Sequence, residues 1–401
     1  MALGLRLGVV GAPRRAPDGH RVPHHAPMRI EDFGVEIWMN RWETSCRYNL
    51  AETCVDSVTV EELLALSGMD AEALTAELLP MRLSYGAIEG SERLRRAIAA
   101  LYETAAPEDV IVTHGAIGAN ALAYQTLVEP GDVVISVVPT YQQHTAIPDS
   151  LGADVRRLRL REEDGWLPDS DELRRLASGG VKVIALVNPN NPTGSLLDAE
   201  RMDAIVGIAR DAGAWILADE VYRGTDQEGD GTSPSFVDRY ERTVGIGSMS
   251  KAFSLAGLRL GWIVAPAELH EAVSRHRDYS TISVGMVDDL LAAIALEAKD
   301  ALLARNRDIV RTNLAILDAW VAGEPLMDYT RPRSGTVALL RYALDLSSEE
   351  LCVRLLDAEG VMLTPGGAMG MEGYLRIGYA NETAVLRGGL ERFSAFLAAM
   401  D

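Results

Sequence analysis

The middle of the chain alternates short apolar runs with segments that repeat their apolar residues at helical spacing. The apolar runs are rich in Val and Ile and predict β-strands at 110–114, 133–138, 183–187, 215–219 and 243–248. Between them, segments 118–128 and 199–213 carry the 3.6-residue period of amphipathic helices. Strands that alternate with helices and are apolar on both faces indicate a mostly parallel sheet with helices on each side, a three-layer α/β sandwich.

The pattern changes after residue 282. A strongly helical segment runs from 286 to 321, and short apolar runs then mix with helices up to the C-terminus, which predicts a smaller α+β domain. We expect residues 61–299 to form the large domain, and residues 28–60 and 300–401 to form the two parts of the small domain. Residues 1–27 are rich in Pro, Arg and His and predict a flexible tail, with Met28 as the start of the fold.

Composition narrows the class of protein. A hydrophobic content of 48% with 24% charged residues is typical of a soluble globular chain. The net charge of -20 argues against nucleic acid or an anionic membrane as a partner, because both attract clustered Lys and Arg. The apolar runs are too short to span a bilayer. The three cysteines have no C-x-x-C spacing, which argues against a disulfide framework or a metal site and favours a reducing cytoplasm.

Three polar segments follow predicted strands. Asn188–Gly194 (N-P-N-N-P-T-G) follows one strand, Asp219 ends the next with Tyr222 three residues later, and Lys251 follows a third. Ligands of parallel sheets bind beyond the carboxyl ends of the strands, where these segments are expected to meet. Small and apolar neighbours around Lys251 predict desolvation, which lowers a lysine pKa and makes the amine nucleophilic. Taken singly, each segment has an alternative interpretation as a structured turn or a strand end.

In this order and at these separations, the segments resemble the class I/II aminotransferases of the aspartate aminotransferase superfamily, which have pyridoxal phosphate fold type I. The resemblance extends from Tyr85 to Arg376. It implies pyridoxal 5'-phosphate as the cofactor and a small-molecule amino acid as the substrate. It also implies a homodimer in which Tyr85 reaches the neighbouring subunit's phosphate.

The same resemblance implies roles around the cofactor ring. Lys251 would hold the cofactor as a Schiff base and then move the proton at the substrate Cα. Asp219 would pair with the pyridine nitrogen, and Tyr222 and Asn191 would bind the ring hydroxyl, with Asn191 also beside the substrate. Tyr141 would stack on the ring, although a packed core aromatic is the alternative.

A phosphate site is expected at the start of the helix that follows the first predicted strand, because free backbone N–H groups there bind anions. The family pattern implies these phosphate-binding residues: Gly115, Ala116, Ile117, Ser248, Ser250 and Arg259. Arg376 matches the arginine that grips the substrate α-carboxylate, with a plain salt bridge as the alternative.

One segment departs from the family pattern. Relatives place a stretch of the type L-x-x-G-x-P near the start of the fold, where this chain has Y-N-L-A-E-T-C-V-D-S, Tyr48 to Ser57. Glu52 in this segment is either a solvated loop residue or a carboxylate that faces a cationic side chain of the substrate. We keep both interpretations, the second as a hypothesis.

A second, shorter resemblance links residues 276–286 to capreomycidine synthases, pyridoxal phosphate enzymes that cyclise hydroxylated arginine in antibiotic biosynthesis. It leaves two reaction classes open, an aminotransferase, which we favour, and a cyclase or β-eliminating lyase acting on 3-hydroxyarginine. A third interpretation is a pyridoxal phosphate-sensing regulatory module. It is disfavoured because the short Pro-rich N-terminus supplies no basic helix-turn-helix segment.

Overall fold

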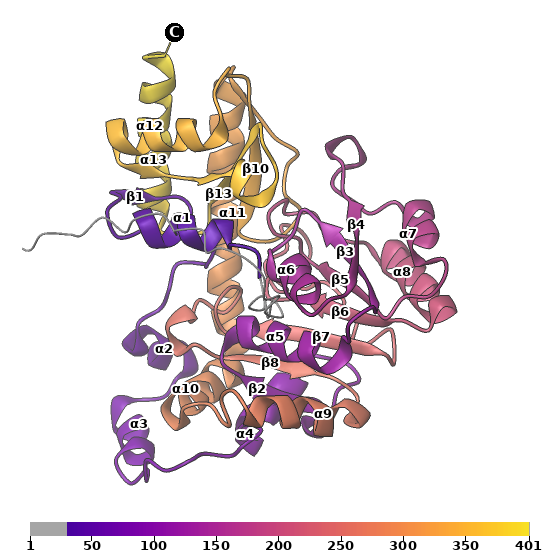
Figure 1. The fold of residues 1–401 in the computed structure, drawn as a ribbon. Helices are drawn as coiled ribbons and strands as arrows, with labels where there is room; N and C mark the ends of the chain where they lie inside the picture. The colour runs from indigo at the N-terminus through magenta and orange to yellow at the C-terminus, as the bar shows by residue number, and fades with distance from the viewer. Residues whose placement is uncertain (1–29, 401) are drawn as a thin grey trace, which may run out of the picture.

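The computed structural model describes residues 30–400, so the predicted tail at 1–27 and Met28 lie outside the described residues. A seven-stranded sheet forms the centre of the molecule, in the order β2-β8-β7-β6-β5-β3-β4 (Figure 1). Its strands are β2 (Val110–Thr113), β3 (Val133–Val138), β4 (Asp154–Arg159), β5 (Val183–Val187), β6 (Trp215–Asp219), β7 (Thr243–Ser248) and β8 (Gly261–Val264). β8 runs in the direction opposite to the other six strands, which are parallel to one another, and this confirms the mostly parallel sheet.

Helices cover both faces of this sheet, as the apolar runs predict. On one face, Ile111, Val183 and Leu217 pack against α5 (Gly115–Leu127) and α9 (Ala267–Asp278). On the other face, Ile184 and Ile216 pack against α7 (Ser170–Ala177) and α8 (Ala199–Ala212). Successive strand residues thus face opposite layers, and both layers are apolar. The remaining helices of this part are α2 (Val60–Ser67), α3 (Ala71–Leu78), α4 (Glu92–Ala99), α6 (Gln143–Ser150) and α10 (Met286–Glu297).

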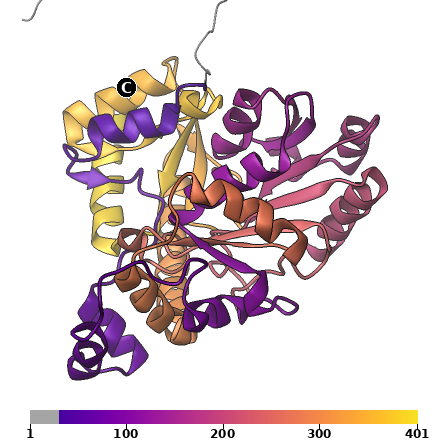
Figure 2. The ribbon, with the colours of Figure 1, turned by 60° about the horizontal axis from the view of Figure 1, so that its bottom comes forward.

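A second body combines the first described residues with the last hundred. It contains a four-stranded antiparallel sheet in the order β12-β13-β10-β9 and a two-stranded parallel sheet, β1-β11. The strands are β1 (Tyr48–Asn49), β9 (Met327–Asp328), β10 (Val337–Tyr342), β11 (Val361–Met362), β12 (Thr364–Pro365) and β13 (Tyr374–Gly378). The helices are α1 (Gly34–Trp42), α12 (Ser348–Glu359) and α13 (Thr383–Ala398). Figure 2 shows α1 beside the C-terminal helices.

One long helix, α11 (Lys299–Gly323), connects the two bodies. Near its start, Leu302 packs with α4 and α10, whereas Val310 and Leu314 join the core that Trp38 shares with the C-terminal strands. The helical pattern at 286–321 is therefore two helices, which meet at Ala298. The domain boundaries at residues 60 and 299 stay predictions. No helix in residues 30–400 has the length and apolar character needed to cross a membrane.

Candidate active site

A cavity of about 330 Å³ lies where β5, β6 and β7 end, between the parallel sheet and α1. Parallel strands bring their carboxyl ends to one edge of the sheet, so segments far apart in the sequence meet there. Twelve of the fourteen predicted site residues line this cavity: Glu52, Ala116, Ile117, Tyr141, Asn191, Asp219, Tyr222, Ser248, Ser250, Lys251, Arg259 and Arg376. The exceptions are Gly115, which lies beneath Arg259, and Tyr85.

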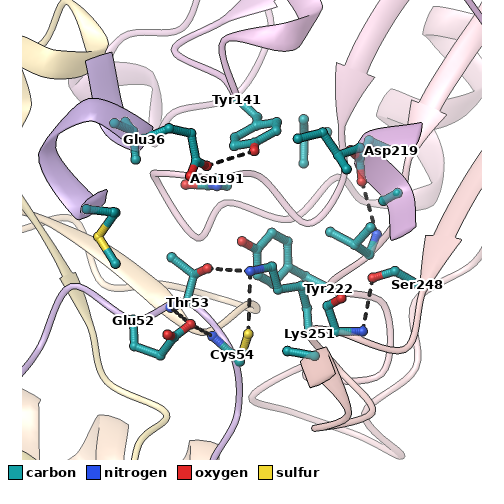
Figure 3. A pocket seen from close by; sticks show the side chains of 18 of the residues that line it. Glu36, Glu52, Thr53, Cys54, Tyr141, Asn191, Asp219, Tyr222, Ser248 and Lys251 are labelled. Carbon is teal, nitrogen blue, oxygen red and sulfur yellow. Dashed lines mark hydrogen bonds between the residues drawn. The ribbon is translucent and has the colours of Figure 1, made fainter. Parts of the chain in front are cut away.

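Lys251 extends from the end of β7 toward the segment that departs from the family pattern. Its Nζ donates hydrogen bonds to Oγ1 of Thr53 at 2.6 Å and to Sγ of Cys54 at 3.5 Å (Figure 3). Burial lowers the pKa of Lys251, but the negative charges that Cys54, Tyr222 and Glu52 carry when ionised raise it above the ordinary lysine value. The expected lowering of this pKa is therefore wrong. The groups responsible lie about two hundred residues away in sequence.

Asp219 lies buried at the end of β6, where polar side chains hold its carboxylate in place. Asn120 donates a 2.9 Å hydrogen bond from Nδ2 to Oδ2 of Asp219, and Nε2 of His144 lies 3.4 Å from the same oxygen. The hydroxyl of Tyr124 lies 3.0 Å from Nδ1 of His144. Asn120 and His144, the two partners of Asp219, were not predicted, because nothing in the local sequence shows that α5 and α6 bring them to this carboxylate.

Arg376 is 2% exposed and extends from β13 into the cavity. Its Nη1 donates to Oδ1 of Asn191 at 3.4 Å, and its Nη2 donates to Oγ1 of Thr364 at 3.2 Å. Nε has no hydrogen-bond partner, and no carboxylate in residues 30–400 forms a salt bridge with this guanidinium. Burial lowers the pKa of Arg376, while negative charge on Tyr222 would raise it. A buried arginine without a carboxylate suits an anionic ligand better than the salt bridge considered above.

Two tyrosines line the cavity on either side of Asn191. The hydroxyl of Tyr141 donates a 3.0 Å hydrogen bond to Oε1 of Glu36 on α1 (Figure 3). Burial and the charge of Glu36 raise the pKa of Tyr141 well above its ordinary value. Tyr222 is fully buried, which raises its pKa, whereas the charges of Lys251 and Arg376 lower it. Both phenols are therefore neutral hydrogen-bonding groups at physiological pH.

The start of α5 lies close to Gly261 of β8 and to Arg259, with Gly115 as its first residue. No side chain caps this helix start, so its first N–H groups are open to a ligand. Gly115 has a φ of +67°, and a Cβ there would lie 3.2 Å from Nη2 of Arg259. A Cβ on Gly261 would come within 2.4 Å of the Gly115 carbonyl carbon. Ser248 and Ser250 also line the cavity, and Oγ of Ser248 accepts a 3.2 Å hydrogen bond from the backbone N–H of Ser250.

Glu52 is half-buried and shapes the turn beside Lys251. Its Oε1 accepts hydrogen bonds from the backbone N–H groups of Thr53 at 2.8 Å and Cys54 at 3.1 Å. Burial raises the pKa of Glu52, but the charge of Lys251 and these N–H groups bring it below its ordinary value. Glu52 is thus not a freely solvated loop residue, and its contact with a substrate side chain stays a hypothesis. Two further carboxylates, Glu36 and Glu43, line the cavity and were not predicted.

Tyr85 lies outside the cavity and is 76% exposed. It belongs to the segment after α3, which protrudes from the body in both ribbon views (Figures 1 and 2). The contact of Tyr85 with the phosphate of a neighbouring subunit therefore stays a prediction.

Comparison with known proteins gives the family. The model of the family described as aminotransferase class I and II matches residues 59–393. The chain belongs to the class I and II aminotransferases. Capreomycidine synthase of Streptomyces vinaceus is 31% identical over 369 residues, which cover 92% of this chain and 94% of that enzyme. This chain is therefore an enzyme of a pyridoxal phosphate-dependent family, and both resemblances seen in the sequence are confirmed.

Two solved structures share the fold over nearly the whole chain. A PLP-dependent aminotransferase from Streptococcus suis 89-1591 has a TM-score of 0.90 and 42% identity, covering 93% of this chain and 99% of that one. The PLP-dependent cyclase OrfR has a TM-score of 0.86 and 29% identity, and the match covers 94% of this chain and 100% of that one. The predicted three-layer fold with its mostly parallel sheet is confirmed.

Pyridoxal 5'-phosphate is the cofactor of this family, and the residues of the cavity fit it. The uncapped start of α5 and Arg259 offer N–H groups and positive charge to a phosphate. Asp219 offers a buried carboxylate to a ring nitrogen, and Lys251 offers an amine to an aldehyde carbon.

Proposed function

We propose that this class I/II aminotransferase family member acts on an α-amino acid with a positively charged side chain, and that its reaction is transamination. One observation carries the proposal: the buried, carboxylate-free Arg376 opens into the same cavity as Lys251. A guanidinium binds the α-carboxylate of an amino acid, while a lysine amine beside it exchanges with the α-amino group. Asn191 contacts Arg376 and so belongs beside the substrate as well.

In this proposal Lys251 would bind the cofactor covalently. Once released, its amine would take the proton from Cα and return it to the cofactor carbon to which the lysine had been bonded. Pyridoxal phosphate supplies a sink for the electron pair left at Cα when it is bound. Asp219, held by Asn120 and His144, hydrogen-bonds the ring nitrogen and keeps it protonated. Asn191 and Tyr222 would bind the ring hydroxyl, and Tyr141 would pack on the ring face, since all three line the cavity.

The phosphate is proposed to bind the start of α5 and the residues that face it. The backbone of Gly115, Ala116 and Ile117 offers N–H groups, and Arg259 offers a charge. Ser248 and Ser250 also line the cavity, and we assign their hydroxyls to the phosphate as well.

The charges of the cavity support a cationic substrate side chain. In the proposed complex Arg259 pairs with the phosphate and Arg376 with the substrate carboxylate. Asp219 pairs with the ring nitrogen, and Lys251 serves the cofactor. The remaining charged side chains that line the cavity are the carboxylates of Glu36, Glu43 and Glu52. None of the three forms an ion pair with an Arg, Lys or His side chain of the described chain. Carboxylates that line a cavity favour a cation there. A guanidinium is such a cation, and we infer an arginine-derived substrate.

A second candidate is cyclisation of 3-hydroxyarginine. Loss of the Cα proton and of the Cβ hydroxyl would release one water. A guanidine nitrogen would then bond to Cβ and lose its proton, and Cα would regain a proton. The likeness to capreomycidine synthase and to the cyclase OrfR supports this candidate. The likeness to the Streptococcus suis aminotransferase, at the higher identity of 42%, supports transamination, which we favour.

We also infer a cytoplasmic homodimer. Leu79, Leu83 and Tyr85 are exposed on the protruding segment, which suits contact with a second copy that receives Tyr85. The three cysteines of the described chain are unpaired, as a reducing compartment favours.

The test combines the purified protein with arginine, 3-hydroxyarginine, aspartate and alanine in turn, with pyruvate or 2-oxoglutarate as amino acceptor. Products are followed by mass spectrometry. Transamination predicts that arginine yields its 2-oxo acid together with an aminated acceptor. A product of 3-hydroxyarginine that has lost one water and kept all its nitrogen would instead support cyclisation. A preference for aspartate over both cationic substrates would contradict the proposed substrate class.

A further inference from the structure

The amine of Lys251 has two polar neighbours to which the proposed function gives no role. Nζ donates to Oγ1 of Thr53 at 2.6 Å and to Sγ of Cys54 at 3.5 Å. Figure 3 shows the lysine side chain extended toward these two residues. Both belong to the segment in which this chain departs from the glycine-containing pattern of its family. A glycine at either position would supply neither the hydroxyl nor the thiol.

The turn that carries these two residues is fixed from both ends. Oε1 of Glu52 accepts hydrogen bonds from the N–H groups of Thr53 and Cys54. The carbonyl oxygen of Thr53 accepts a 2.7 Å hydrogen bond from Oγ1 of Thr336. Cys54 is itself buried. A backbone held in this way presents the hydroxyl and the thiol to the cavity in one orientation.

We propose that Thr53 and Cys54 form a docking position for the amine of Lys251 whenever this amine is not bonded to the cofactor. The inference rests on the proposed function, in which a substrate amine displaces Lys251. A threonine hydroxyl accepts a hydrogen bond from an ammonium and donates one to a neutral amine, so it holds the lysine in both protonation states that proton transfer requires.

The thiol has a lesser part in this arrangement. Burial raises the pKa of Cys54 to about 11, so the thiol is neutral at physiological pH and contributes a weak contact. The charge of Glu52 also raises the pKa of Lys251. Thr53, Cys54 and Glu52 are therefore positioning residues, which act on the reaction through Lys251.

The first test measures how readily a substrate displaces Lys251. The probe is α-methylarginine, which exchanges with the lysine but has no Cα proton to lose. Thr53→Val keeps the side-chain shape and removes the hydroxyl, so the apparent Kd of the probe is expected to rise roughly tenfold. Thr53→Ser keeps the hydroxyl and should stay within about twofold of the wild type, and Cys54→Ala should cause a smaller rise than Thr53→Val.

A second readout separates positioning from a merely structural role. The full-length protein is loaded with pyridoxamine phosphate, which cannot bond to Lys251, and the lysine is acetylated over a range of pH and detected by peptide mass spectrometry. Loss of the Thr53 hydroxyl removes a partner of the ammonium, so the midpoint pH of acetylation should fall in Thr53→Val and return in Thr53→Ser.

Unchanged probe affinity and unchanged acetylation in Thr53→Val would overturn the docking position. Equal changes in Thr53→Val and Thr53→Ser would also overturn it, because the hydroxyl would then not be the cause. Failure of the proposed function is recognised separately, in the wild type, by the absence of a borohydride-reducible bond between pyridoxal phosphate and Lys251. Such a result would remove the inference as well.

Discussion

Nη1 of Arg376 donates a 3.4 Å hydrogen bond to Oδ1 of Asn191, although 185 residues separate the two in sequence. Arg376 lies on β13 of the antiparallel sheet, and Asn191 lies in the loop after β5 of the parallel sheet. The contact therefore joins the two bodies of the molecule at the cavity. In the proposed function it places the group that binds the substrate carboxylate beside a group that binds the cofactor ring.

Replacing Arg376 by lysine should strongly weaken amino acid binding. A lysine keeps the charge but loses the planar pair of donors that binds a carboxylate at two points. We expect kcat/KM to fall about 10²- to 10³-fold, mostly through KM. Steady-state kinetics with the best substrate measures the effect, with the exposed Arg387→Lys as the control. A KM within about threefold of the wild type would show that Arg376 does not bind the substrate.

Adding a methyl group at Gly261 should damage the phosphate site. Its Cβ would meet Gly115 and Ala116 backbone atoms at 2.4 and 2.5 Å, so the start of α5 must shift. We expect Gly261→Ala to weaken pyridoxal phosphate binding at least about tenfold and to destabilise the fold by roughly 1–3 kcal/mol. Fluorescence titration of the cofactor and thermal unfolding measure the two effects.

The matched control is Gly257→Ala, since no atom lies within 4 Å of a Cβ at that position. Equal cofactor affinity in the two variants would contradict a phosphate site at the start of α5.

Glu220 should make the fold less stable as pH rises toward neutrality. Burial raises the pKa of this carboxyl from 4.5 to about 7, even though Arg223 and hydrogen bonds from Ser235 and Phe236 lower it. Between these two values the unfolded chain has lost the proton and the folded chain retains it, so stability falls with rising pH and then levels off above pH 7. The slope from this group is at most about 1.4 kcal/mol per pH unit.

Chemical denaturation between pH 5 and 8 measures this dependence. Glu220→Gln should flatten the curve between pH 5 and 7, because the amide does not titrate there. An equally steep curve in the variant would show that another group causes the loss of stability.

Glu43 should contribute to the choice of a cationic substrate. It lines the cavity at the end of α1 and is exposed, so its effect is partly screened by salt. Citrulline has the shape of arginine without its charge. We expect Glu43→Gln to reduce the ratio of kcat/KM for arginine over citrulline by about three- to tenfold at low salt. The control is Glu391→Gln, because Glu391 is an exposed carboxylate on α13. An unchanged ratio in Glu43→Gln would show that Glu43 does not contribute to substrate choice.

The sequence was sufficient to predict the central sheet and most of the cavity, because Asn191, Asp219 and Lys251 each follow an apolar run that could be recognised as a strand. Parallel topology then brings their positions together. Strand β4 was not predicted, since D-V-R-R-L-R is an edge strand with charged residues among its apolar ones. Strand β8 has only four residues and gives little pattern. The break at Ala298 was also missed, because no Gly or Pro marks it.

The contacts that set the electrostatics of the site could not be predicted in this way. Thr53 meets Lys251, and His144 meets Asp219, through packing between distant elements. Local patterns carry no information on such contacts, and for that reason the pKa of Lys251 was predicted in the wrong direction.

The most direct test of the central claim is to locate the cofactor on the chain. The protein is incubated with pyridoxal phosphate, reduced with borohydride and digested, and the modified peptide is identified by mass spectrometry, with and without prior addition of arginine. We expect one modified residue, Lys251, and a loss of this modification when arginine displaces the lysine before reduction. Modification of another lysine, or a Lys251 modification that no amino acid displaces, would show that Lys251 is not the residue that holds the cofactor and exchanges with the substrate.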